Sequence, residues 1–324
     1  MTVITVSFIV EGMSPTATTS TPGTLATTST SALPRTSARS EQLVAASAKN
    51  TLDPFRDIDW SIPVDDRAVH LPPELLPLYG TAPWESMTEA ERIAYSRHET
   101  VALLGAGIWF ENALMQIVLR HLLDIPVTDP AHRYLLVEVA DECRHSTMFG
   151  EYIRRAGTPV YGPTRPVELD DTSSGRALSY LLILAVEEFL DFMNRATMRD
   201  ERVHPVSRQI AKLHVLEEAR HVSFAKTYLS EIWPTLDQAD RQIVIDNAAA
   251  LIAAIVAMSL DGALYDDLGI ADGLAIARNN PTYQATVIAG LAKLTGFLSD
   301  VGIVDESSRP TWAALGLIEA EPAR

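Results

Sequence analysis

Residues 214–221 read His-Val-Leu-Glu-Glu-Ala-Arg-His, and residues 138–145, 76 positions upstream, read Glu-Val-Ala-Asp-Glu-Cys-Arg-His. Both stretches contain the core acid-Glu-x-Arg-His. A further glutamate stands 31 residues before the central Glu in both copies, at Glu111 and Glu187. We therefore interpret the chain as a duplicated helical hairpin that carries a Glu on one arm and a Glu-x-x-His on the other.

The spacing within each motif is helical. Residues three and four apart share one face of an α-helix, so Glu142 and His145 point the same way, and His214, Glu218 and His221 form one stripe. A four-helix bundle builds a carboxylate-bridged two-metal site from such a layout. The sequence therefore predicts that four Glu and two His meet at one level of a bundle interior: Glu111, Glu142, His145, Glu187, Glu218 and His221.

His214 is the informative departure between the two motifs, because the first motif has Glu138 at the equivalent place. A histidine there can be an ordinary core residue. Since His214 is in line with Glu218 and His221, we favour a third histidine ligand.

The turns support the hairpin interpretation. About 20 Å of helix leads away from Glu111, about 17 Å returns to Glu142, and Pro126–Pro130 between them suits a reversal. We expect an all-α four-helix bundle with additional C-terminal helices. The expected helices cover residues 88–124, 131–155, 175–199, 207–232, 238–264, 281–299 and 311–317. Gly105 and Gly107 each weaken the first of these, so the sequence leaves its continuity to residue 124 open.

Composition divides the chain into three expected parts. Residues 1–50 are rich in Ser, Thr and Pro and are expected to be a disordered leader. Residues 51–85 contain several prolines and aromatics and are expected to form an extended arm packed on the bundle. Residues 86–324 are expected to form the helical bundle domain.

Charge and cysteine content limit the partners. The formal net charge of −16 argues against nucleic acid and against anionic membrane surfaces. Cys143 is the only cysteine, which fits a reducing cytoplasm, and we expect it to be a small buried residue. We predict no transmembrane span.

Four charged residues flank the motif positions: Asp141, Arg144, Glu217 and Arg220. We hypothesise that the two acids accept a hydrogen bond from a ligand imidazole and fix its tautomer, while the two arginines balance their charge. The alternative is ordinary surface ion pairing. Glu188 competes with Glu187 as a ligand, and Glu99 competes with Glu111, but the matched 31-residue spacing favours Glu187 and Glu111.

Four Glu and neutral His suit iron or manganese better than zinc. Four carboxylates neutralise two divalent ions, so the bundle interior keeps no large uncompensated charge. Two such ions, roughly 3.5–4 Å apart and bridged by carboxylate, can reduce O2 jointly.

At residues 85–300 the chain resembles the ferritin-like diiron carboxylate proteins, because of the paired acid-Glu-x-Arg-His motifs. The added His214-x-x-x-Glu218-x-x-His221 is similar to the arylamine N-oxygenases of the p-aminobenzoate N-oxygenase family. The resemblance implies two iron ions bridged by Glu142 and Glu218. The implied iron ligands are Glu111, Glu142, His145, Glu187, His214, Glu218 and His221, with no catalytic residue beyond them.

The resemblance also implies an activity, namely oxidation of an arylamine to hydroxylamine and nitro compound with O2. It implies an external electron donor of the ferredoxin or reductase type, and a homodimer. No Arg lies between Arg97 and Arg120, so the helix that carries Glu111 offers no cation to a substrate carboxylate. We therefore expect a less charged amine than p-aminobenzoate.

Three alternatives remain open. One is a diiron C–H hydroxylase or desaturase, against which the third histidine argues. Another is a ribonucleotide reductase small subunit, whose radical tyrosine position holds Phe149 here, with Tyr152 nearby. The third is an iron-storage or purely structural bundle, which does not need the complete duplicated set of ligands.

Overall fold

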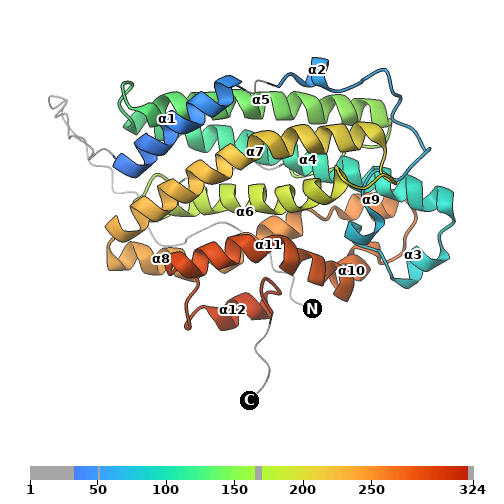
Figure 1. The fold of residues 1–324 in the computed structure, drawn as a ribbon. Coiled ribbons are helices and arrows are strands. Elements are labelled where there is room, and N and C mark those ends of the chain that lie inside the picture. The colour runs from blue at the N-terminus through green and yellow to red at the C-terminus, as the bar shows by residue number, and fades with distance from the viewer. Residues whose placement is uncertain (1–32, 50–51, 165–169, 320–324) are drawn as a thin grey trace, which may run out of the picture.

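The computed structural model describes residues 33–49, 52–164 and 170–319 (Figure 1). In these ranges the chain forms helices joined by turns and short loops, and no β-strand. One isolated bridge pairs Val69 with Val203. The prediction of an all-α fold is confirmed.

Four long helices form the bundle: α4 (Glu89–His121), α5 (Pro130–Ala156), α6 (Ser173–Thr197) and α7 (Pro205–Ile232). Helix α4 packs along α5, and α6 packs along α7, so each predicted hairpin is a pair of neighbouring helices (Figure 1). The duplicated arrangement of a ferritin-like bundle is therefore present.

The helix ends have local chemical causes. Thr88 and Glu91 form a capping box at the start of α4. Asp129 accepts a hydrogen bond from the Ala131 amide at the start of α5, where Pro130 occupies the first position. Helix α5 ends at Gly157, whose φ of 64° is easily adopted only without a side chain.

Helix α4 continues unbroken through Gly105 and Gly107, which the sequence alone left uncertain. A Cβ on Gly105 would lie 2.0 Å from the backbone oxygen of Tyr161. Glycine at this position therefore lets the segment after α5 cross directly over α4. The short helix η2 (Leu122–Asp124) follows directly after the end of α4.

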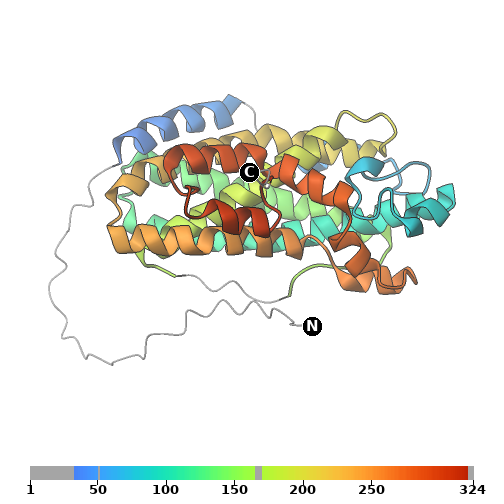
Figure 2. The same cartoon turned by 90° about the horizontal axis from the view of Figure 1, so that it is seen from below.

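The C-terminal helices are α8 (Gln238–Met258), α9 (Gly262–Asp267), α10 (Gly273–Arg278), α11 (Pro281–Val301) and α12 (Arg309–Ala314), with η3 (Trp233–Thr235) before them. Helices α8 and α11 both pack on α6, and Figure 2 shows the C-terminal helices across one face of the bundle. The helix expected over 238–264 is divided at residues 259–261, and α10 was not expected.

Helix α1 (Pro34–Lys49) corrects one expectation. The sequence analysis expected disorder through residue 50, but this segment is a helix that packs on α5 and α7. Its buried face consists of Thr36, Ser40, Leu43 and Ser47. The residues that repeat at helical spacing on this face are therefore mainly small and polar. The Glu231 carboxylate accepts hydrogen bonds from the amides of Arg35 and Thr36 and anchors the start of the helix. Residues 1–32 lie outside the described part.

The segment before the bundle contains α2 (Pro54–Asp57), η1 (Pro73–Leu75) and α3 (Ala82–Ser86). Helix α2 packs on α5, and Leu76 and Leu78 are buried. The division into leader, arm and bundle domain stays a prediction.

Two helical stretches are apolar and long enough to cross a bilayer by composition alone, residues 89–124 and 238–267. The first includes α4, a central helix of the bundle whose apolar stretch is 56% buried inside the protein. This helix is therefore weak evidence for a membrane span. A cytoplasmic location stays a prediction.

Candidate metal centre

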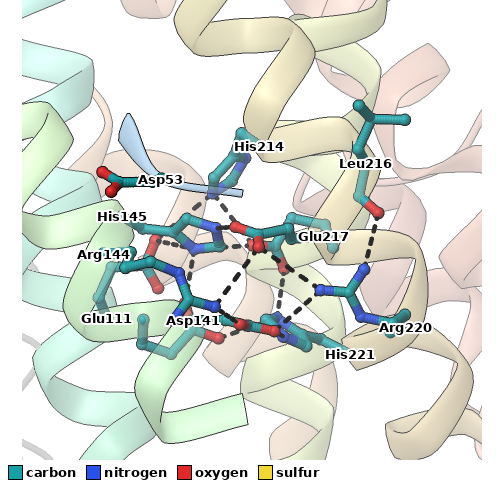
Figure 3. Close-up of polar contacts among 12 residues, drawn as sticks. Asp53, Glu111, Asp141, Arg144, His145, His214, Leu216, Glu217, Arg220 and His221 are labelled. Atoms are coloured by element: carbon teal, nitrogen blue, oxygen red, sulfur yellow. Dashed lines mark hydrogen bonds and ion pairs between the residues drawn. The ribbon is translucent and has the colours of Figure 1, made fainter. Parts of the chain in front are cut away.

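Figure 3 shows the polar side chains that meet between α4, α5 and α7. All seven residues predicted as ligands converge in the bundle interior, and none is more than 2% exposed. They form two groups in which the possible ligand atoms lie within 4.8 Å of one another. One group is Glu111, His145 and His214; the other is Glu142, Glu187, Glu218 and His221.

Glu142 and Glu218 belong to the second group but also reach His145 of the first group. One oxygen of Glu142 is 2.8 Å from Nδ1 of His145 and the other is 2.9 Å from Nδ1 of His221. Glu218 repeats this arrangement, at 3.0 Å from His145 and 2.9 Å from His221. Each carboxylate therefore spans both imidazoles, which is the geometry that a bridging ligand needs.

His214 lies beside Glu111 and Glu218, with Nε2 at 3.5 Å and 3.2 Å from their oxygens. Its Nδ1 is 2.8 Å from the side-chain amide of Asn194, a residue that the sequence analysis missed. For Nε2 to bind a metal, Nδ1 must carry the proton. Asn194 must then present its oxygen to that N–H, which a 180° rotation of the amide allows.

The outward nitrogens of the other two histidines meet acids of the opposite hairpin. Nε2 of His145 is 2.9 Å from Glu217, and Nε2 of His221 is 3.2 Å from Asp141. When these nitrogens donate to the carboxylates, both Nδ1 atoms are left as acceptors that face the centre. The pairing is crosswise, because the α7 acid holds the α5 histidine and the α5 acid holds the α7 histidine.

Two arginines, Arg144 and Arg220, lie beside Asp141 and Glu217 (Figure 3). Arg144 donates to Asp141 and lies 3.5 Å from Glu217. Arg220 donates to Asp141 at 3.0 Å and lies 3.6 Å from Glu217. The four residues thus form a network of two acids and two cations, and Asp141, Glu217 and Arg220 in it are buried.

Burial and repulsion between neighbouring carboxylates have the largest effects on the pKa values of the glutamates at the centre. Burial, reinforced by nearby carboxylates, raises the pKa of Glu111 and of Glu187 well above the usual value. Burial also acts to raise the pKa of Glu218, but His221 and His214 outweigh it and lower that pKa. In the absence of metal cations, Glu111 and Glu187 therefore favour their protonated, neutral forms.

Several buried atoms at the centre lack a hydrogen-bond partner: Glu111 Oε1, Glu142 Oε1, Glu187 Oε2, His214 Nε2 and Glu218 Oε1. Unpaired buried acceptors are costly and therefore rare in folded proteins. They belong to five of the seven side chains whose ligand atoms converge. A set of carboxylate oxygens and imidazole nitrogens with this geometry fits two divalent ions such as iron.

The competing glutamates face elsewhere. Glu188 pairs with Lys226, and Glu99 accepts a hydrogen bond from the Tyr265 hydroxyl at 3.0 Å. Gly107, one turn before Glu111, lies against the Phe149 ring, so that ring fills the space which glycine leaves.

Glu138 was not predicted as a site residue. It is fully buried, neither of its oxygens has a hydrogen-bond partner, and burial raises its pKa to about 8. Its position corresponds to His214 in the other hairpin, which was the available signal. Cys143 is exposed, contrary to expectation, because it lies on the outer face of α5.

Comparison with known proteins gives two findings. A family model described as P-aminobenzoate N-oxygenase AurF matches residues 34–302. Uncharacterized proteins Rv0885 of Mycobacterium tuberculosis and Mb0909 of Mycobacterium bovis are each 32% identical over 213 residues, 61% of this chain. The match spans 62% of the length of these relatives.

Proposed function

Because this chain belongs to the p-aminobenzoate N-oxygenase AurF family, we propose that it is a non-haem diiron monooxygenase that oxidises the amine of an arylamine-type substrate. The family implies a diiron centre and an oxygenase. The observation that carries the proposal is the position of Glu142 and Glu218, each of which spans both motif histidines.

We assign the ligands as the geometry groups them. Glu111, His145 and His214 would hold one iron and Glu187 and His221 the other. Glu142 and Glu218, which reach both motif histidines, would be shared by the two ions. When bound, the two irons supply the chemistry that reduces O2. Glu217 and Asp141 keep the proton of each motif imidazole on the outward nitrogen, so that the inward nitrogen remains a ligand.

The reaction needs electrons from outside. Conversion of an amine to a hydroxylamine by O2 consumes two electrons and two protons and releases one water, and further oxidation gives the nitro compound. We therefore propose an external donor of the ferredoxin or reductase type. The absence of Arg between Arg97 and Arg120 on α4 favours an amine without a carboxylate near the reacting nitrogen.

The test has two stages. Protein reconstituted anaerobically with Fe(II) is expected to hold two iron ions per chain, and metal analysis distinguishes iron from manganese. The reduced protein is then mixed with O2 and a panel of arylamines, and the products are identified by mass spectrometry. Products oxidised only at carbon would favour a hydroxylase or desaturase, and many irons per chain would favour storage.

Neighbouring glutamates supply a matched control. Glu187→Gln is expected to reduce iron content by about half and to abolish amine oxidation, because it replaces a proposed ligand. Glu188→Gln changes the next residue of α6, whose side chain points to Lys226, and should retain both properties. Equal behaviour of the two variants would contradict the ligand assignment.

A further inference from the structure

A layer of buried rings lies at one end of the bundle, where α4 and α7 end and α5 and α6 begin. It consists of His121, Tyr134, Tyr180, Phe224 and Tyr228, none more than 7% exposed. Each of the four bundle helices contributes to this aromatic layer. Tyr180 and Tyr228 lie seven residues from Glu187 and His221 along their helices, about 10 Å from the metal centre.

Tyr180 and His121 form the closest contact in the layer. The Tyr180 hydroxyl is 2.5 Å from Nδ1 of His121. The Tyr228 ring lies 4.2 Å from the Tyr180 ring and 4.8 Å from the His121 ring, measured between centroids. The three rings therefore form one compact group.

Further rings connect this group to the metal centre. Phe224 lies 6.2 Å from Tyr180 and 5.1 Å from Tyr134. Phe224 is three residues after His221, so the two side chains are neighbours on α7. Aromatic contacts thus run from Tyr180 to Phe224, which lies one helical turn from the proposed iron ligand His221.

The other side of the group reaches the surface. His121 lines a small surface pocket together with Arg120, Asp171 and Arg176. Arg176 also pairs with Asp124 at the end of η2. A proton or an electron that leaves the Tyr180–His121 pair on this side has a short path to solvent.

We propose that Tyr180 and His121 act as a redox pair that passes single electrons between the metal centre and this surface pocket. The inference rests on the proposed function, because the oxygen-reacted iron centre is the oxidant. In the forward step Tyr180 loses one electron to the centre, and its phenolic proton moves to Nδ1 of His121. A one-electron donor protein of the ferredoxin class then returns an electron, and the proton moves back.

The chemistry of the neighbours selects Tyr180 among the tyrosines of the layer. The Tyr134 hydroxyl has no hydrogen-bond partner, and the Tyr228 hydroxyl interacts with Arg176, which cannot accept a proton. Burial lowers the pKa of His121 to about 3, so its imidazole is neutral and can accept. Burial also raises the pKa of Tyr180, so the phenol keeps its proton until it is oxidised.

The other end of the bundle supplies a matched control. Tyr152 lies seven residues after His145, is fully buried, and has its hydroxyl 2.8 Å from Nδ1 of His70. Its ring contact is with His70, at 6.0 Å between centroids. Tyr152→Phe and Tyr180→Phe therefore remove the same group from similar surroundings on opposite sides of the centre.

The experiment uses the iron-loaded, reduced protein, mixed with O2 without amine, frozen at intervals and examined by electron paramagnetic resonance. We expect a tyrosyl radical whose hyperfine pattern changes when the tyrosines are deuterated. Tyr180→Phe should lower its yield at least tenfold, and Tyr152→Phe should leave it unchanged. Melting temperatures and circular dichroism of both variants establish that they fold.

The outcomes separate this inference from the proposed function. Iron binding and amine oxidation without a tyrosyl radical would overturn the redox pair alone. A radical that survives in Tyr180→Phe, or that is lost in Tyr152→Phe, would do the same. A protein that binds no iron would refute both proposals.

Discussion

Asp141 and Glu217 show how single residues connect the two hairpins. Each acid contacts the imidazole of the other motif helix and also both Arg144 and Arg220. A change at one acid therefore affects both a proposed iron ligand and a buried charge network.

Asp141→Asn tests this connection. The amide oxygen can still accept from His221, but Arg144 and Arg220 keep only Glu217 as a carboxylate partner. We expect metal affinity to fall about 10–100-fold, and stability to fall by about 1.5–3 kcal/mol because the buried Arg220 loses one hydrogen bond to a charged partner. Competition with a chelator and urea unfolding measure the two effects. Asp266→Asn, an exposed acid outside the network, is the control, and equal affinities in the two variants would count against the role of Asp141.

Glu99 permits a second test at the residue scale. Burial raises its pKa to about 7, from an ordinary value of 4.5. The folded state therefore binds more protons than the unfolded state between these two values, and the contribution of Glu99 to stability falls as pH rises through this window. Glu99→Gln cannot titrate, and its amide oxygen can still accept from Tyr265.

We therefore expect Glu99→Gln to gain stability relative to the parent protein between pH 4.5 and 7, by about 3 kcal/mol in total. Above pH 7 the difference should stay constant. Denaturant unfolding of both proteins across this range measures it, and a difference independent of pH would mean that Glu99 is ionised throughout.

At the scale of helices, glycines in similar helical positions have different roles. Gly105 in α4 lies under the backbone of Tyr161, whereas a Cβ on Gly150 in α5 would have no atom within 4 Å. Helix propensity favours alanine over glycine at both positions. Only the packing of the segment after α5 distinguishes them.

Gly105→Ala should therefore destabilise the protein by about 1–3 kcal/mol, because the new methyl group displaces backbone atoms. Gly150→Ala should stabilise it by about 0.5–1 kcal/mol through the reduced entropy of the unfolded chain. Urea unfolding of the two variants measures both changes. Stabilisation by Gly105→Ala would show that the loop moves away from α4 easily.

At the scale of the whole molecule, metal binding should determine stability. Ligands that bind only the folded state raise its melting temperature. The raised pKa values of Glu111 and Glu187 mean that protons must leave when metal binds, so the stabilisation by Fe(II) should grow as pH rises from 5 to 7. Anaerobic calorimetry with Fe(II) or with chelator measures the shift, and Glu218→Ala should abolish most of it. An equal Fe(II) shift in that variant would argue against a bridging Glu218.

The bundle could be predicted from sequence because its signals are local. The capping box at Thr88, the turn before Pro130 and the repeat of Glu and His depend only on residues within a few positions or at one fixed interval. Helix α1 was missed because its buried face presents Thr36, Ser40 and Ser47, which hydrophobic periodicity does not detect.

The sequence by itself determined which side chains share a helix face, since 3.6 residues per turn holds in every helix. That is why the seven candidate ligands could be named before any coordinates. Only the tertiary structure decided how the helices turn toward one another. That rotation pairs Asp141 with His221 and Glu217 with His145, directs Glu188 to Lys226, and places Tyr180 against His121. These contacts join residues far apart in the chain, and no local spacing encodes the angle between two packed helices.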